Sequence, residues 1–174
     1  MGNRAFIMFR DRQGTCSPAI YLHSNGNPEC VYALVDAAVK LGMMEDVFYT
    51  SARFAQMAAA YVDHTNKHSP EYKFNGIGLH NGPHQFTEYG VEPSDELKAI
   101  TADNHGLYIF DMQGRIEKRV FKFRPAAAIQ QPSFMPDSLA ASEYEEAKYS
   151  HEHTEILELL AGKQTPNGTF TSNC

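Results

Sequence analysis

The residues best suited to chemistry stand at the end of a short apolar run at 19–23. His23, Asn25 and Gly26 occupy a polar loop that leads into a predicted helix. The N–H groups and positive dipole of a helix N-terminus can receive an anion, and a histidine can act there as a general base. His23 is therefore a catalytic candidate, and all three are ligand-binding candidates. The alternative is a plain turn in which His23 is a structural donor.

Four residues elsewhere could complete such a pocket. Asp103 is the second catalytic candidate, and Asn104 and Tyr108 are ligand-binding candidates at the start of another predicted strand. Arg53, on a predicted helix, could supply a cation for a phosphate or carboxylate. This hypothesis requires the side chains to converge in one concave cleft. The alternative is an Asx turn at 103–104 and a solvated Arg53.

The histidines do not amount to a metal site. His64 and His68 are four residues apart, and His80 and His84 flank a predicted loop, but nothing in the sequence brings the two pairs together. A His-Glu-x-x-His motif near the C-terminal end is incomplete, because Glu155 stands where its second histidine would be. We therefore expect no metal and no cofactor.

Charge is concentrated in one segment of the 174-residue chain. The formal net charge is −6, and residues 137–160 hold seven acidic residues against Lys148 alone. An acidic helix face can mimic nucleic acid toward a basic partner. The partner-binding candidates on this segment are Glu145, Glu146, Glu152 and Glu155.

A basic run at 118–124 interleaves Lys and Arg with two phenylalanines, a pattern that could bind single strands of nucleic acid. The chain outside 137–160 is nearly neutral, however, and affinity for nucleic acid depends on a basic face. We therefore interpret the run as a charged edge strand, protected against aggregation. Nucleic acid is not an expected partner.

Composition indicates a single domain with a real core. Hydrophobic residues make up 43% of the chain and aromatic residues 11%, enough to offset the entropy of ordering the backbone. Three cysteines without metal-type spacing are typical of reduced thiols in the cytosol. No apolar run approaches the roughly 20 residues that span a bilayer. We expect a cytoplasmic protein without a membrane segment.

Two helices are predicted from apolar residues at spacings of three and four. The first begins at Pro28 after Asn27, is centred near Leu34 and stops at Gly42, and the second covers 48–64 around Met57. Short β-prone apolar runs predict five strands, and an interrupted apolar stripe predicts a third helix. The strands are expected at 4–9, 19–23, 74–80, 106–111 and 115–123, with the first two and the last two forming hairpins, and the third helix at 143–160.

This order predicts an α+β fold with a mainly antiparallel sheet, two helices packed on one face, and a C-terminal helical extension. We expect no internal repeat. The predicted divisions are an α+β domain at 1–124, a Pro/Ala-rich linker at 125–142, an acidic helix at 143–161 and a disordered tail at 162–174.

Three short motifs resemble a family of uncharacterised proteins from bacteria, phages and other mobile elements. The chain has GNRAFI at 2–7, YLHSNG at 21–26 and DNHGLY at 103–108, where the family pattern reads GNRAVITF, YLHWNGG and DNGxY. Ser24 replaces the Trp of the pattern, Asn27 replaces its second Gly, and His105 is inserted. If that Trp stacks on a ligand in the family, this chain lacks the contact. Residues from 125 onward have no counterpart in the pattern.

Two functional hypotheses follow. The first is a non-enzymatic binding protein of a phage or mobile element that occupies a protein partner in the cytoplasm of a bacterial host, for example as an inhibitor of a host defence system. The second is a small enzyme or ligand-binding domain with its pocket around His23, Asn25 and Asp103. The oligomeric state does not follow from the sequence.

Overall fold

The computed structural model describes residues 3–65, 76–80, 86–87, 90–91, 105–126, 129–134 and 137–162. The main sheet contains β1 (Ala5–Arg10), β2 (Ala19–Leu22), β3 (Ile77–His80), β6 (Leu107–Asp111), β7 (Ile116–Ala126) and β8 (Ile129–Phe134). A separate ladder pairs β4 (Phe86–Thr87) with β5 (Gly90–Val91). The described helices are α1 (Pro28–Lys40), α2 (Val47–Thr65), α4 (Asp137–Lys148) and α5 (His151–Ala161).

The main sheet is mixed, with strand order β3-β2-β1-β6-β7-β8. Strands β1 and β6 run parallel at its centre, and the other four neighbouring pairs are antiparallel. Both predicted hairpins, β1 with β2 and β6 with β7, are confirmed. The α+β prediction and the mainly antiparallel sheet are confirmed, with the central parallel pair as the feature that the sequence did not reveal.

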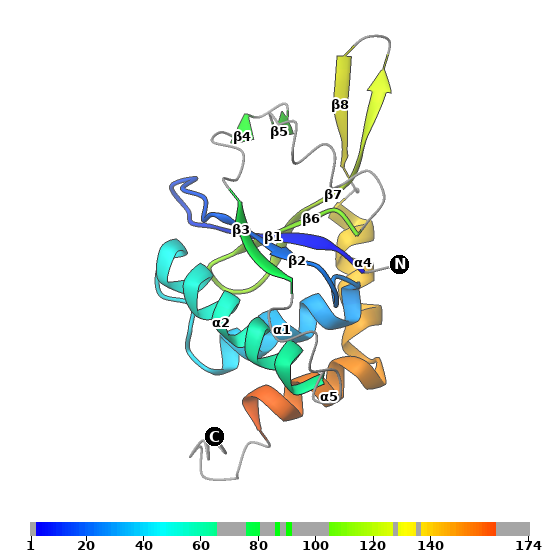
Figure 1. Ribbon diagram of the computed structural model, residues 1–174. Helices are drawn as coiled ribbons and strands as arrows, with labels where there is room; N and C mark the ends of the chain where they lie inside the picture. Colours follow the sequence, from blue (N-terminus) through cyan, green and yellow to red (C-terminus); the bar gives the residue numbers. More distant parts are fainter. Residues whose placement is uncertain are drawn as a thin grey trace.

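Helices α1 and α2 lie on the same side of the sheet, as predicted (Figure 1). Alternate residues of β1 point into this helix layer, where Ile7 and Phe9 join Phe54 of α2 in the main core. The intervening residues Phe6 and Met8 belong to a second buried cluster on the other face. Strand β1 is therefore buried on both faces, which explains why it reads as a continuous apolar run instead of alternating.

The segment predicted as a linker at 125–142 instead contains regular structure. Strand β7 continues to Ala126 and pairs with β8, and together they form a ribbon that rises from the sheet (Figure 1). Pro125 and Pro132 are accommodated because the pairing of β7 with β6 ends at Val120, so that beyond this point β7 and β8 pair only with each other among the described strands. Proline was a misleading linker signal here.

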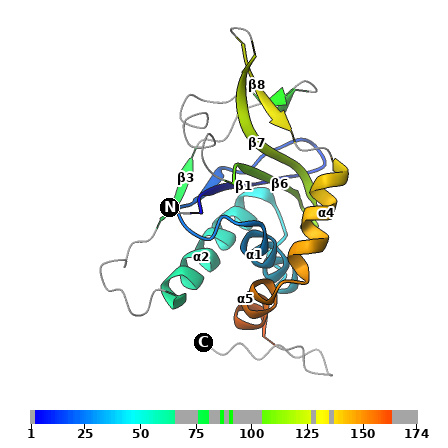
Figure 2. The ribbon, with the colours of Figure 1, turned by 90° about the vertical axis from the view of Figure 1, so that its right-hand side faces the viewer.

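The single helix predicted at 143–160 is two helices, and α4 begins at Asp137, inside the predicted linker. The break falls at Tyr149 and Ser150, where the Ser150 hydroxyl accepts a hydrogen bond from the backbone N–H of His153 at 3.1 Å and so caps α5. Both helices contact α1, and α4 also packs along β7 (Figure 2). The helices predicted as a C-terminal extension therefore pack on the α+β domain. The tail at 163–174 lies outside the described residues.

A tight approach at Gly26 joins the loop after β2 to β1. The Gly26 N–H donates to the Asn3 carbonyl at 2.7 Å, and the Gly26 carbonyl accepts from the Tyr108 hydroxyl at 3.0 Å. A Cβ at Gly26 would lie 2.6 Å from the Ala5 Cβ and 2.7 Å from the Ala5 backbone nitrogen. Only glycine fits here without moving the backbone of β1.

We therefore expect Gly26→Ala to lower the free energy of unfolding by about 3 kcal/mol, because the clashing atoms include backbone that cannot turn aside. Gly42→Ala is the control: its Cβ would meet no atom within 4 Å, and it bears only the strain of a φ of +67°, about 1 kcal/mol. Urea denaturation of both variants measures the difference. A Gly26→Ala protein as stable as the control would contradict this packing.

Candidate functional site

A buried ion pair between Arg119 of β7 and Glu143 of α4 is the centre of the polar structure. The Arg119 side chain is 0% exposed, and its Nε donates to Glu143 Oε1 at 2.8 Å. One terminal nitrogen donates to the carbonyl oxygens of His105 and Leu107, at 2.7 and 3.3 Å. The guanidinium carbon lies 3.4 Å from the centre of the Tyr108 ring. Protein groups therefore replace the water that this charge loses.

Two tyrosines complete the cluster. The Tyr32 hydroxyl donates to Glu143 Oε1 at 3.0 Å, and the Tyr108 hydroxyl donates to the Gly26 carbonyl at 3.0 Å. Burial raises the pKa of both phenols well above the ordinary value, so they stay protonated and act as donors. The cluster joins α1, β6, β7, α4 and the loop after β2, and its contacts hold the fold together.

The edge-strand prediction for the basic run at 118–124 is confirmed only in part, because β7 pairs with β6 up to Val120 and with β8 from Val120 onward, which gives most of these residues one paired strand among the described residues. Strand β7 lies between β6 and β8, and Arg119 points into the interior. No local pattern predicts the burial of Arg119, which directly follows the charged residues Glu117 and Lys118 as an exposed residue would.

The predicted pocket around His23 is not assembled from the described residues. His23 is exposed, and its Nδ1 lies 2.9 Å from the Tyr21 hydroxyl, whose ring packs on Phe6. Phe6 belongs to the cluster on the sheet face away from the helices, whereas Tyr108 is fully buried on the helix face. His23 and Tyr108 are therefore not brought together. Asn25 adopts a φ of +66°, typical of the turn alternative.

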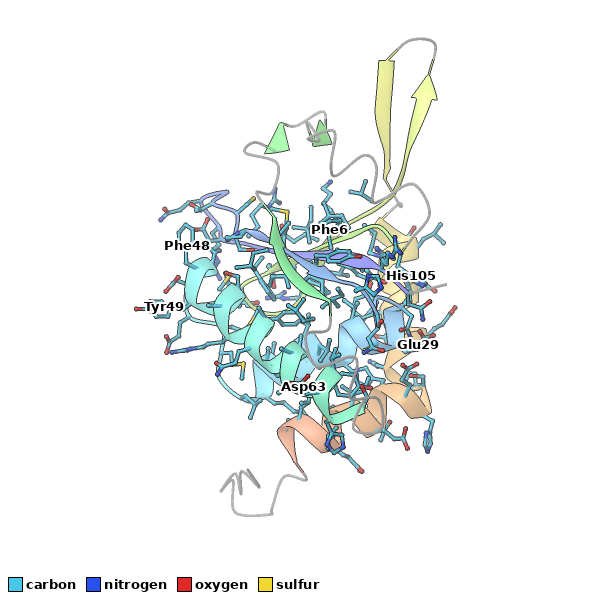
Figure 3. The ribbon with its side chains drawn as sticks, viewed as in Figure 1. Phe6, Glu29, Phe48, Tyr49, Asp63 and His105 are labelled. Carbon is cyan, nitrogen blue, oxygen red and sulfur yellow. The ribbon has the colours of Figure 1, made fainter. Side chains whose placement is uncertain are left out.

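Arg53 does not join this region. Arg53 pairs with Glu45 at 3.2 Å and lies over the Tyr49 ring at 5.6 Å. Figure 3 places Tyr49 on the opposite side of the molecule from His105. Arg53 thus cannot supply a cation near His23 or Tyr108. Asp103 and Asn104 lie outside the described residues.

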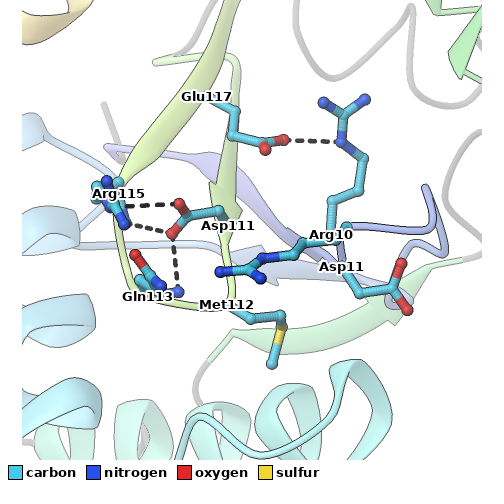
Figure 4. Close-up of a pocket in the computed structure, with 8 residues that line it drawn as sticks. Arg10, Asp11, Asp111, Met112, Gln113, Arg115 and Glu117 are labelled. Atoms are coloured by element: carbon cyan, nitrogen blue, oxygen red, sulfur yellow. Dashed lines mark hydrogen bonds and ion pairs between the residues drawn. The ribbon is translucent and has the colours of Figure 1, made fainter.

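A small crevice opens where the parallel strands β1 and β6 end (Figure 4). Each strand is followed by an Asp-x-Gln-Gly turn, a short repeat that the sequence prediction missed. Asp11 Oδ1 accepts the N–H groups of Gln13 and Thr15, and Asp111 Oδ1 accepts those of Gln113 and Arg115, at 2.8–2.9 Å. Arg10 pairs across the crevice with Glu117 at 2.7 Å. Its volume of about 160 Å³ is enclosed by groups that stabilise the two turns.

The outer surface of α4 and α5 forms what we call the acidic face, defined by the exposed residues Glu145, Glu146, Glu152, Glu155 and Glu158. It contains all four predicted partner-binding candidates. Glu145 pairs with Lys148 at 2.7 Å, and Glu155 with His151 at 3.4 Å.

Glu152 ties the acidic face to the start of α1. It accepts a hydrogen bond from the Asn27 amide at 3.0 Å, and the same amide donates to Glu29 at 3.0 Å. Asn27 occupies the predicted N-cap position, but its side chain makes these bonds instead of capping α1.

A second buried polar contact holds this face in place. His153 of α5 is 4% exposed, and its Nε2 lies 2.8 Å from Asp36 Oδ2 on α1. The Tyr144 hydroxyl of α4 donates to the same carboxylate, 3.3 Å from each oxygen. Neither His153 nor Asp36 was predicted from the sequence to make a buried contact. Their separation of 117 residues leaves no local signal of the contact.

Thiol chemistry is not favoured at the described cysteines. Burial raises the pKa of Cys16 to about 11, and the Cys30 thiol is shifted in the same direction by deeper burial. No group of three His, Cys, Asp or Glu side chains in the described ranges is arranged to hold a metal ion. None of the helices in these ranges has the length and apolar character needed to span a bilayer.

Comparisons of the chain with protein-family models, curated proteins and solved structures find no match. Function is therefore inferred from the geometry of the described residues.

Replacing Arg119 should test the central cluster. We expect Arg119→Met to lower the free energy of unfolding by about 3 kcal/mol, because Glu143, whose side chain is only 17% exposed, would lose its charge partner. Adding Glu143→Gln should restore part of the loss. Arg115→Met is the control: the Arg115 side chain is 72% exposed and lies 3.5 Å from Asp111, so its loss should cost less than about 1 kcal/mol. Equal effects of the two single variants in urea denaturation would contradict the burial of Arg119.

His105 should make stability depend on pH. Burial, followed by the nearby positive charge of Arg119, lowers the pKa of His105 below its ordinary 6.5. As pH falls through 6.5, His105 is protonated in the unfolded chain but stays neutral in the folded protein, so the free energy of unfolding falls.

We expect His105→Asn to lose less stability than the wild type between pH 7.5 and 5, as measured by urea denaturation. The substitution keeps the backbone bonds of residue 105 to Arg4 and Arg119. Parallel curves for the two proteins across this range would show that His105 titrates alike in both states.

Proposed function

We propose that this protein is a non-enzymatic binding protein whose acidic face docks on a basic surface of a protein partner. The observation that carries the proposal is the exposure of five glutamates on two helices that buried contacts fix to the core. A fixed array of charge requires little ordering on binding, which favours affinity. The array also steers a basic partner toward the acidic face, and this electrostatic attraction weakens as salt is added.

Exposed apolar side chains on the same helices offer apolar contacts to a partner, in addition to the electrostatic attraction of the glutamates. Tyr149, between α4 and α5, is 80% exposed, and Leu139 of α4 is 57% exposed. Binding energy in protein interfaces concentrates on aromatic anchors surrounded by polar groups. A basic partner with an apolar pocket for Tyr149 fits this surface best.

The resemblance to proteins of phages and mobile elements supports a host macromolecule as the partner, and inhibition of a host defence system is one role of this kind. Acidic helices repel phosphate, which disfavours nucleic acid at this face. The enzyme alternative around His23, Asn25 and Asp103 stays a prediction: Asp103 lies outside the described residues, and of the other candidates Tyr108 contacts Gly26 whereas Arg53 pairs with Glu45.

Charge reversal on the acidic face tests the proposal. We expect Glu145→Lys/Glu146→Lys to reduce capture of the partner at least tenfold in affinity purification with the tagged full chain from cells of the source organism, because like charges would then face each other. Deleting α4 and α5 is unsuitable, since it removes Glu143 and His153 from the core.

The matched control is Glu45→Lys/Asp63→Lys, which makes the same change of charge on exposed residues outside α4 and α5. The control should retain the partner as the wild type does. Recovery of the wild type without any partner, or equal capture by all three proteins, would refute the proposed function.

A further inference from the structure

A cleft of about 500 Å³ lies between the C-terminal parts of α2 and α5. Tyr61 and His64 of α2 line one side, and Glu155, Glu158 and Leu159 of α5 line the other, with Ile156 beside them. Its volume falls in the range of small-molecule sites, roughly 300–1,000 Å³. The crevice at the ends of β1 and β6 is about a third of this size, since its volume is about 160 Å³.

The electrostatics of this cleft favour a cation. Part of its lining comes from the last turns of α2 and α5, whose carbonyl ends carry partial negative charge, and His64 is the basic residue at the α2 end. Glu158 adds a carboxylate in the last turn of α5, which has no basic residue, and Glu155 adds a second carboxylate three residues earlier. Within the described ranges Glu158 forms no ion pair, and Glu155 pairs only with the exposed His151. Negative charge here destabilises α5, and a bound cation would offset that cost.

The apolar part of the lining favours an organic cation over a metal ion. Tyr61 is 8% exposed and Ile156 2% exposed, and both contribute to the main core while bordering the cleft. An aromatic ring beside carboxylates attracts an ammonium group through its face. Burial, with lesser help from nearby acidic charge, raises the pKa of Tyr61 to about 12, so its phenol stays neutral. A hydrocarbon chain would use the apolar surface, which a bare metal ion would not.

We propose that the α2–α5 cleft binds a linear polyamine, with its ammonium groups at Glu155 and Glu158 and its methylene chain along Tyr61 and Ile156. This inference does not require the proposed function. The two share Glu155 and Glu158, but the docking of a protein partner can be tested through Glu145 and Glu146, which do not line the cleft.

Isothermal titration calorimetry with spermidine on the full chain tests the site. We expect saturable binding at one site that weakens at least tenfold in Glu155→Gln/Glu158→Gln. Glu145→Gln/Glu146→Gln removes the same charge outside the cleft and should bind within twofold of the wild type. Without spermidine, the first variant should melt no lower than the wild type, because it relieves repulsion in α5.

Two further ligands test whether the binding measured with spermidine requires a polyamine or is shared by a single ammonium group or a metal ion. Butylamine carries the single ammonium of a lysine side chain, and we expect it to bind at least tenfold more weakly than spermidine. Mg²⁺ at equal ionic strength should leave most of the spermidine binding intact. Absence of saturable binding, equal losses in both variants, equal affinity for butylamine, or full displacement by Mg²⁺ would each overturn the inference. A protein that captures its partner yet binds no spermidine would overturn this inference alone.

Discussion

The buried charge of Arg119 is the constraint on which the rest of the structure depends. A guanidinium at 0% exposure must find partners for its donors, and these come from the Glu143 carboxylate, two carbonyl oxygens at the start of β6 and the face of Tyr108. The carboxylate belongs to α4, so α4 must lie across β7. The C-terminal helices are therefore part of the domain and not an appendage.

Fixing α4 in this way determines the surface that the protein presents. The Asp36–His153 contact anchors α5 to α1 in the same manner, and the glutamates on the outer sides of both helices are left in solvent. The protein thus uses Asp36 and Glu143 to hold the C-terminal helices, while the exposed glutamates of α4 and α5 make a charged exterior. A rigid acidic surface costs self-repulsion within each helix, which is an unfavourable choice for stability alone.

The parallel pairing of β1 and β6 shapes the opposite end of the molecule. Each of the two strands is followed directly by an Asp-x-Gln-Gly turn and an antiparallel partner, so two equivalent hairpins lie side by side. The aspartates bind the backbone of their own turns. This end is consequently occupied by structural ion pairs, whereas Glu158 in the cleft between α2 and α5 forms no ion pair within the described ranges.

Local periodicity determined much of the fold. The apolar spacing around Leu34 and Met57 was sufficient to predict α1 and α2, and the runs beside Gly-containing turns predicted both hairpins. Tertiary structure alone decided which charges are buried. Arg119 and Glu143 are 24 residues apart in the sequence, and Asp36 and His153 are 117 residues apart. The pattern of neighbouring residues indicates neither contact. Periodicity reports which face of an element is apolar, but a polar side chain becomes interior only when a distant partner replaces its water.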